Sequence, residues 1–188
     1  NNLKETNDYQ LVLTDRNQLA GLPDSVVEAA AETTREKGLA EGWTFTLQAP
    51  SYVPFMQYAD NRDLRHKLYL AYNTKCTHPD NGYSNLDIVK QIANDHLELA
   101  RLMGYRDYAD YVLRHRMAQD STHVYRLLEQ LLEAYTPAAR REVAEVEALA
   151  RELEGDDFIL MPWDWSYYSQ KLKDRKYSLN DEMLRPYF

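Results

Sequence analysis

One long apolar repeat limits what this chain can fold into more than any other feature of its sequence. Between residues 121 and 153, leucines and valines recur at the three- and four-residue spacing that places them on one face of an α-helix. Pro137 interrupts the repeat, and a proline inside a helix removes a backbone hydrogen bond. We therefore expect either a kink or two helices that meet at Pro137, with Gly155 ending the run.

Shorter helices are predicted through most of the remaining sequence. Each is preceded by a proline or by a short polar side chain that can accept hydrogen bonds from the first free backbone N–H groups. The predicted starts are Pro23 with Ser25 and Glu28 as a capping box, then Ser51, Asn61, Ser84, Asp107, Asp120 or Ser121, Asp164, and Ser178 with Asp181.

Residues 42–50 break this helical pattern. Trp43, Phe45 and Leu47 alternate with polar residues, which is the period of a half-buried strand. Residues 9–14 alternate more weakly and form either a short strand or an extended segment. The predicted fold class is mainly α, a multi-helix array with at most a small β-hairpin that pairs residues 11–13 with residues 43–47.

Composition excludes several classes of function. The chain has 22 basic and 30 acidic side chains and a net charge of −8, so we expect no nucleic-acid partner, which would require clustered Lys and Arg. No run of about 18 apolar residues is present, so we expect no membrane span. Cys76 is the single cysteine, which leaves both cytoplasm and periplasm open. Because the chain starts on Asn1 and stops on an apolar Phe188, we expect a piece of a longer protein.

Metal-ligand spacing is weak in this sequence. None of the five histidines is spaced four residues from another, so the His-Glu-x-x-His pattern of helical zinc peptidases is absent. Cys76, His78 and Asp80 cluster in a polar loop at residues 73–83, but three neighbouring ligands without a distant fourth are typical of a solvated loop. We expect no metal there, and we interpret Cys76 and His96 as structural.

Aromatic residues supply the candidate site. The chain has fifteen tyrosines, whose rings pack apolarly while their hydroxyls seek polar partners. Two interpretations stay open for the aromatic cluster near the C-terminus: anchors of a helical core, or the wall of a substrate cleft. The residues concerned are Trp163, Asp164, Trp165, Tyr167 and Tyr168.

Several segments resemble, in the same order along the chain, the thimet oligopeptidase family. The first is Leu-Ala-Gly-Leu-Pro at residues 19–23. Within the family the likeness is strongest to the bacterial peptidyl-dipeptidase and oligopeptidase A branch, and Trp-Asp-Trp at residues 163–165 favours the peptidyl-dipeptidase. The other matching segments are residues 45–47, 50–54, 61–65, 69–72, 102–105, 108–110, 117–118, 162–168 and 184–188.

This resemblance implies a zinc metallopeptidase with a mainly helical fold and a deep channel for short peptides. In such enzymes the glutamate of a His-Glu-x-x-His helix acts as general base for a zinc-bound water. That helix lies beyond Phe188 in the family, so the resemblance implies zinc in the full-length parent and no catalytic or metal residue in this fragment. The fragment alone is expected to be inactive.

The resemblance also predicts the organisation of the chain. Residues 1–188 are expected to form a single helical segment of a larger metallopeptidase. Residues 1–60 would form an entry segment with the possible hairpin, and residues 61–188 would form the helical start of the peptidase domain. Its partners would be short peptide substrates of the parent and the remainder of its own chain. Substrate preference, and dipeptide release against internal cleavage, stay open.

The alternative is a free-standing helical module that binds a peptide or protein without enzymatic activity. The two hypotheses differ in the surface that they predict. A fragment exposes an apolar surface where the missing part docks, whereas an independent module has polar flanks.

Overall fold

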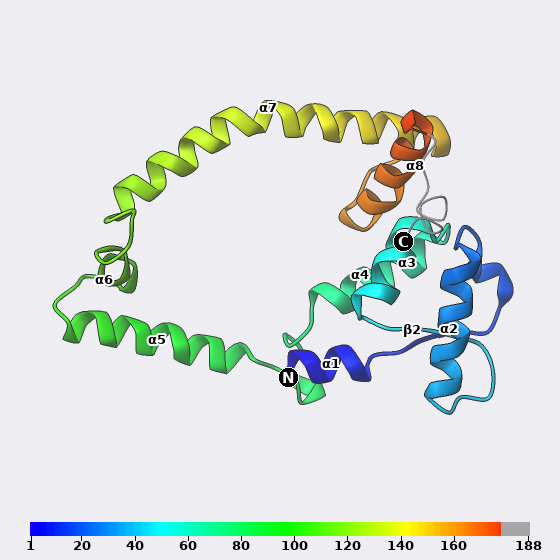
Figure 1. Ribbon diagram of the computed structural model, residues 1–188, viewed down its shortest axis with the longest axis horizontal. Coiled ribbons are helices and arrows are strands. Elements are labelled where there is room, and N and C mark those ends of the chain that lie inside the picture. Colours follow the sequence, from blue (N-terminus) through cyan, green and yellow to red (C-terminus); the bar gives the residue numbers. More distant parts are fainter. Residues whose placement is uncertain (178–188) are drawn as a thin grey trace, which may run out of the picture. The chain divides into compact units, whose positions relative to one another are not determined.

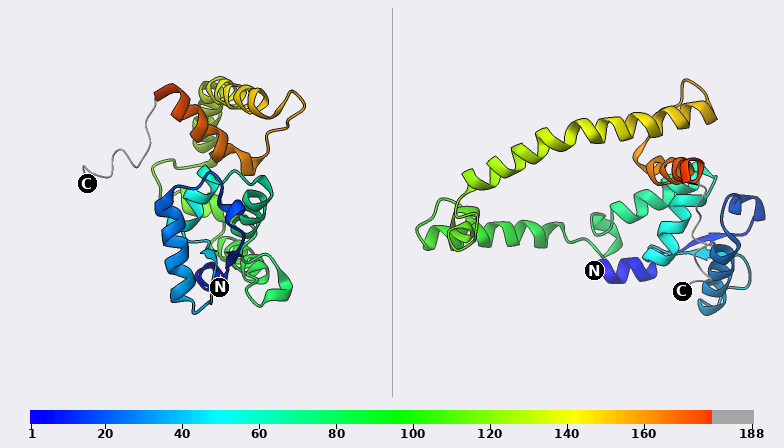
Figure 2. Two further views of the ribbon diagram at one scale, coloured as in Figure 1. Left: turned by 90° about the vertical axis from the view of Figure 1, so that its right-hand side faces the viewer. Right: turned by 45° about the horizontal axis from the view of Figure 1, so that its top comes forward.

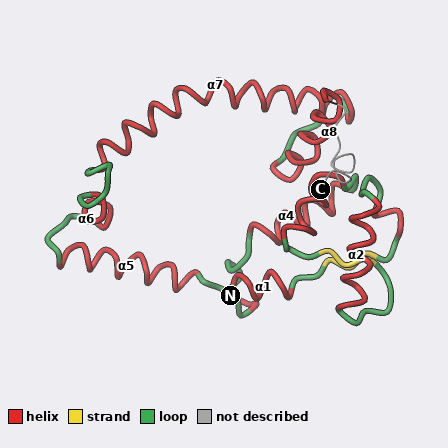
Figure 3. The backbone as a smooth tube through the Cα atoms, viewed as in Figure 1, coloured by secondary structure: helices red, strands yellow, loops and turns green. Residues whose placement is uncertain are grey.

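A computed structural model describes residues 1–177 as two compact units. Unit 1 combines Asn1–Tyr83 with the described part of the segment that begins at Ala144, and unit 2 is Ser84–Val143. The boundary between them falls inside the longest helix, α7 (Ser121–Glu154). Helices dominate both units (Figure 3), which confirms the prediction of a mainly α fold.

Two short strands pair in unit 1. β1 (Leu11–Leu13) runs antiparallel to β2 (Trp43–Phe45), with Leu11 opposite Phe45 and Leu13 opposite Trp43. The predicted pairing is confirmed, although β2 ends at Phe45 and not at Leu47. The connection between the strands is longer than the tight turn of a hairpin, because it runs through the 3₁₀ helix Arg16–Leu19 and helix α2 (Asp24–Glu36).

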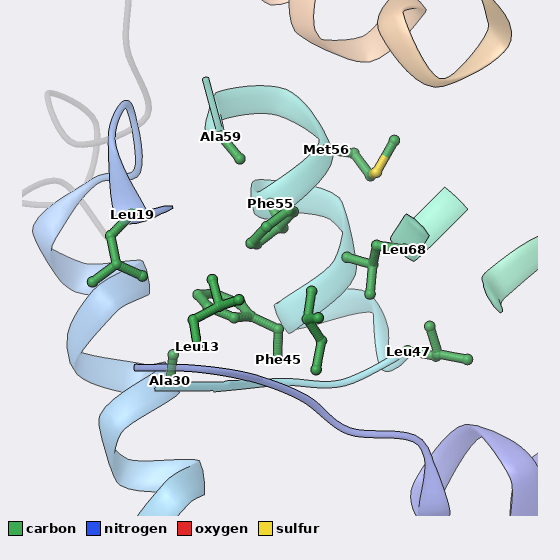
Figure 4. Packing of buried hydrophobic residues seen from close by; sticks show 10 residues of the cluster. Leu13, Leu19, Ala30, Phe45, Leu47, Phe55, Met56, Ala59 and Leu68 are labelled. Atoms are coloured by element: carbon green, nitrogen blue, oxygen red, sulfur yellow. The ribbon is translucent and has the colours of Figure 1, made fainter. Parts of the chain in front are cut away.

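The core of unit 1 forms where these strands meet helix α3 (Ala49–Tyr58). The rings of Phe45 and Phe55 meet edge to face with centroids 4.6 Å apart, a favourable aromatic geometry. Leu13 joins them from β1, and Leu68 joins from helix α4 (Arg62–Asn73), as Figure 4 shows. Because α3 and α4 contribute to this one core, their ends are held in fixed positions.

Side-chain caps confirm three of the predicted helix starts. Asn61 Oδ1 accepts a hydrogen bond of 3.1 Å from the Leu64 N–H at the start of α4. Asp107 caps α6 (Tyr108–Leu113) in the same way, and Asp120 accepts from the His123 N–H at the start of α7. Each carboxylate or amide oxygen satisfies an N–H group that has no partner within its own helix.

Other predicted starts are displaced along the chain. Helix α2 begins at Asp24 with Pro23 as its N-cap residue, one residue before Ser25. Helix α3 begins two residues before Ser51, since Pro50 favours helical φ in the first turn, and the Ser51 Oγ instead accepts from the Thr46 N–H. The short helix α1 (Asn2–Asp8) was not predicted, and the start assigned to Ser178 and Asp181 lies outside the described residues.

Unit 2 consists of helix α5 (Leu86–Leu102), α6 and the first part of α7 (Figure 1). Helices α5 and α6 are in contact, and the His96 ring stacks on Tyr108 with centroids 3.9 Å apart. Helix α7 continues through Pro137 as one helix, so the alternative of two separate helices is wrong. A single missing N–H group leaves the other backbone hydrogen bonds of this long helix in place.

Candidate functional site

The segment that the sequence singles out turns sharply in unit 1. A 3₁₀ helix, η3 (Pro162–Asp164), leads directly into helix α8 (Trp165–Tyr177). The side chain of Asp164 is 0% exposed, and its Oδ2 accepts a hydrogen bond of 3.1 Å from the Met161 N–H. We predicted Asp164 as the cap of α8, but its carboxylate closes the turn before the helix instead.

Two arginines of α4 enclose the Asp164 carboxylate. Arg65 is 1% exposed and places Nη2 3.0 Å from Asp164 Oδ1. Arg62 contacts the same carboxylate with Nη2, 2.7 Å from Oδ2, and with Nε, 3.1 Å from both oxygens. The side chains reach one point because residues three apart lie on the same face of a helix. A buried carboxylate held by two guanidinium groups joins α4 rigidly to η3.

Tyrosine hydroxyls extend this cluster on both sides. The Tyr167 hydroxyl donates to Asp60 Oδ1 at 2.7 Å, and the Tyr168 hydroxyl donates to Glu154 Oε1 at 2.9 Å. The guanidinium carbon of Arg65 lies 4.0 Å from the centre of the Tyr167 ring, a cation–π contact. The cluster therefore connects the link between α3 and α4 with the end of α7 and with α8, which packs beside α3 (Figure 2).

The hydroxyls of Tyr167 and Tyr168 should lose their protons at a higher pH than an ordinary tyrosine. Burial and the hydrogen bonds to carboxylates raise the pKa of Tyr167 and Tyr168 above the ordinary 10.0, and burial raises the pKa of Tyr52 to about 12. The folded state then keeps protons that the unfolded chain releases, so this contribution to stability is complete below pH 10 and is lost as the pH rises further. An absorbance titration at 295 nm should show a late-ionising class that loses one tyrosine in Tyr168→Phe.

One result of the same titration would contradict this prediction. Ionisation of all fifteen tyrosines near pH 10, while circular dichroism still shows the folded helices, would contradict the hydrogen-bonded cluster. Tyr177→Phe is the matched control, since that side chain is 66% exposed and lies outside the buried cluster.

A hollow of about 510 Å³ lies against the cluster in unit 1. Trp163 forms part of its wall and stacks on the His66 ring, with centroids 3.9 Å apart. Arg62 also lines it, together with the carboxylates of Asp63, Glu154 and Asp157. The hollow thus combines an aromatic wall with charged side chains.

Trp165 lies apart from Trp163 and is 39% exposed. It lines a second, smaller hollow of about 400 Å³ with Leu160, Met161 and Pro162. The five predicted site residues thus divide into two groups. Asp164, Tyr167 and Tyr168 are buried in the cluster, while Trp163 and Trp165 keep surface on two different hollows.

Metal-binding side chains do not converge in the described residues. No group of three or more His, Cys, Asp or Glu there is arranged to hold a metal ion. In the polar loop, His78 Nε2 lies 2.9 Å from Thr74 Oγ1, and the backbone N–H of Cys76 donates to the Glu5 carboxylate. The residues that the structure describes therefore do not fit the zinc centre of a peptidase.

Comparison with known sequences identifies the family. The sequence profile of Peptidase family M3 matches residues 55–188, which is more than half of the chain. The chain belongs to peptidase family M3. Its match begins within α3 and includes both arginines and the whole Pro-Trp-Asp-Trp segment.

Relatives in this family are much longer than the chain. Oligopeptidase A of Haemophilus influenzae is 37% identical and that of Escherichia coli 39% identical, over 100% of this chain and 28% of each relative. The dipeptidyl carboxypeptidase of Escherichia coli is 29% identical over 95% of this chain and 26% of its own length. The family M3 chain thus spans about a quarter of these relatives.

Sequence reasoning missed the two arginines as site residues. Arg62 and Arg65 contributed to the family resemblance, but no role was assigned to them. Their spacing of three on a predicted helix was the available signal, because it places two cations on one face. In the described part of the chain, no helix is both long enough and apolar enough to cross a membrane.

Proposed function

We propose that this chain is a non-catalytic helical part of a zinc-dependent peptidase that hydrolyses short peptides. The observation that carries the proposal is the family M3 match over residues 55–188, supported by 37% identity to an oligopeptidase A over the whole chain. Family membership favours this function over a free-standing binding module, since no separate feature of the described residues points to an independent partner.

Zinc would be held outside this sequence. The 188 residues contain no His-Glu-x-x-His, and the described side chains do not assemble a metal site. When bound in the parent, zinc would supply the Lewis acid that activates water for attack on a peptide bond. Residues 1–188 would then contribute the supporting scaffold and surfaces that contact substrate, but no catalytic residue.

Within this chain, we propose Trp163 and Trp165 as the residues that meet the peptide. Both keep exposed surface on a hollow, and an indole ring offers a large apolar face and one N–H donor. Asp164 stands between them in the sequence and is fixed by Arg62 and Arg65. We assign Asp164, Tyr167 and Tyr168 a positioning role, because their buried contacts set the direction of the two tryptophans.

The test is an assay of the full-length parent with a fluorescence-quenched peptide. We expect hydrolysis that a zinc chelator abolishes and added zinc restores, and none from the 188-residue chain. Trp163→Ala should raise KM by about two- to tenfold with little change in kcat, the loss expected for one aromatic contact. Tyr177→Ala, which removes an exposed ring outside both hollows, is the control.

Either of two results would overturn the proposal: an inactive, folded, zinc-loaded parent, or hydrolysis by the 188-residue chain above background. The masses of the products decide the finer question of cleavage pattern. Trp-Asp-Trp in the sequence favours C-terminal dipeptides, whereas the identity to oligopeptidase A is higher than that to dipeptidyl carboxypeptidase, so internal cleavage stays open.

A further inference from the structure

One face of α7 carries apolar side chains that are not buried by any other part of unit 2. At about 100° per residue, Leu127, Leu128, Leu131 and Tyr135 fall on one face of the helix, with Glu133 on the opposite face. The four side chains are between 40% and 66% exposed. An amphipathic helix ordinarily buries such a stripe, so this face lacks its packing partner.

Helix α5 has a similar face. Ile88, Ile92, Leu99 and Leu102 share one side of the helix and are between 41% and 85% exposed. Ala100 lies on a different side and is 0% exposed. The contact with α6 therefore leaves the face with Ile88, Ile92, Leu99 and Leu102 exposed to solvent. We refer to these eight side chains on α5 and α7 as the unit 2 apolar faces.

Unit 2 has almost no interior of its own. Of its residues, all of which the structure describes, Ala100 is the one that is buried. Helices in water are marginal without tertiary packing, because backbone hydrogen bonds alone barely offset the loss of conformational entropy. Unit 2 therefore lacks the tertiary packing that ordinarily stabilises helices of this kind.

We propose that the remainder of the parent chain covers the unit 2 apolar faces and forms the missing core with apolar side chains of its own, an inference that rests on the proposed function. The chain matches 28% of the length of oligopeptidase A, so roughly 72% of such a relative lies outside the matched part and is available as cover. Apolar patches left open on monomeric proteins are usually small, whereas these faces extend along two helices. A second copy of the chain would bring the same net charge of −8 into contact with itself, which opposes association.

The experiment compares two cysteine variants of the full-length parent. Leu128→Cys lies on an apolar face, and Glu133→Cys lies on the opposite, charged side of the same helix. Each variant is treated with a maleimide, and labelling is read from the mass of the peptide that contains the new thiol. We expect the thiol at position 128 to label at least about tenfold more slowly than the thiol at position 133, at every protein concentration.

The other outcomes overturn the proposal. Equal labelling rates would show that the face is open to solvent, and protection that disappears on dilution would show that a second copy covers it. Amide hydrogen exchange of the unmodified parent over residues 124–135 gives the same answer if a variant does not fold. Neither readout depends on hydrolysis, so an inactive parent with protected faces would overturn the proposed function alone.

Discussion

Replacing Asp164 with asparagine is expected to lower the free energy of unfolding by about 3–5 kcal/mol. The substitution keeps the shape of the side chain but removes its charge. Arg65, at 1% exposed, would then remain buried without a counter-ion, and an amide NH₂ would face the donors of Arg62. The measurement is urea unfolding followed by tryptophan fluorescence, which reports on unit 1 because all three tryptophans lie there.

Glu152→Gln is the matched control for this change. Glu152 pairs with Arg175 through two hydrogen bonds, but the side chains are 62% and 48% exposed. Surface ion pairs contribute at most about 1 kcal/mol, because water screens them. Equal losses in the two variants would contradict the interpretation of Asp164 as a buried charge that needs its partners.

A second variant separates the charge from the packing. Arg65→Met removes the buried cation that Asp164→Asn leaves unpaired, while it keeps much of the side-chain volume. The double variant should therefore lose less stability than the sum of the two single variants. Additive losses would show that the two side chains contribute independently.

Gly21→Ala is the other change with a large expected effect on stability. Gly21 has a φ of +84°, and an added Cβ would lie 2.2 Å from the Tyr58 carbonyl oxygen and 2.6 Å from Asp60 Oδ1. The positive φ alone costs about 1–2 kcal/mol for a residue with a side chain. We expect a larger loss, because relief of the clash must also shift the backbone hydrogen bond of 2.9 Å between the Asp60 N–H and the Ala20 carbonyl.

Gly38→Ala isolates the contribution of backbone strain. Gly38 also has a positive φ, +71°, but no atom lies within 4 Å of an added Cβ. Urea unfolding should show a loss of about 1–2 kcal/mol for Gly38→Ala and a clearly larger loss for Gly21→Ala. Similar losses at the two positions would mean that the approach of Tyr58 and Asp60 has no energetic consequence.

Gly21 lies in the first of the segments that resemble the family. Leu-Ala-Gly-Leu-Pro lies about forty residues from Asp60 in the sequence, yet in the fold its glycine touches Tyr58 and Asp60 directly. Asp60 in turn accepts a hydrogen bond from the Tyr167 hydroxyl. The glycine thus permits a close backbone contact beside the Asp164 cluster, a role that its own neighbours in the sequence do not indicate.

Local patterns were sufficient for most of the helices. Asn61 and Asp107 start helices as predicted, because capping depends only on a side chain and the N–H groups a few residues ahead. Pairing between residues 11–13 and 43–47 was also predicted from two alternating segments, and the structure forms it over residues 43–45. The start predicted at Ser51 was wrong, because Pro50 favours a helix that begins earlier, and no polar capping side chain indicates that earlier start.

The sequence by itself determined the mainly α class, the family and three of the helix starts, because these depend on local periodicity, on capping side chains and on the order of segments along the chain. Only the tertiary structure decided which of the five site residues are buried. Asp164 and Trp165 are neighbours in the chain, yet one is 0% and the other 39% exposed. Burial of Asp164 depends on Arg62 and Arg65, about a hundred residues earlier. Such long-range pairing of charges has no local signature, because it exists only after α4 and η3 have packed together.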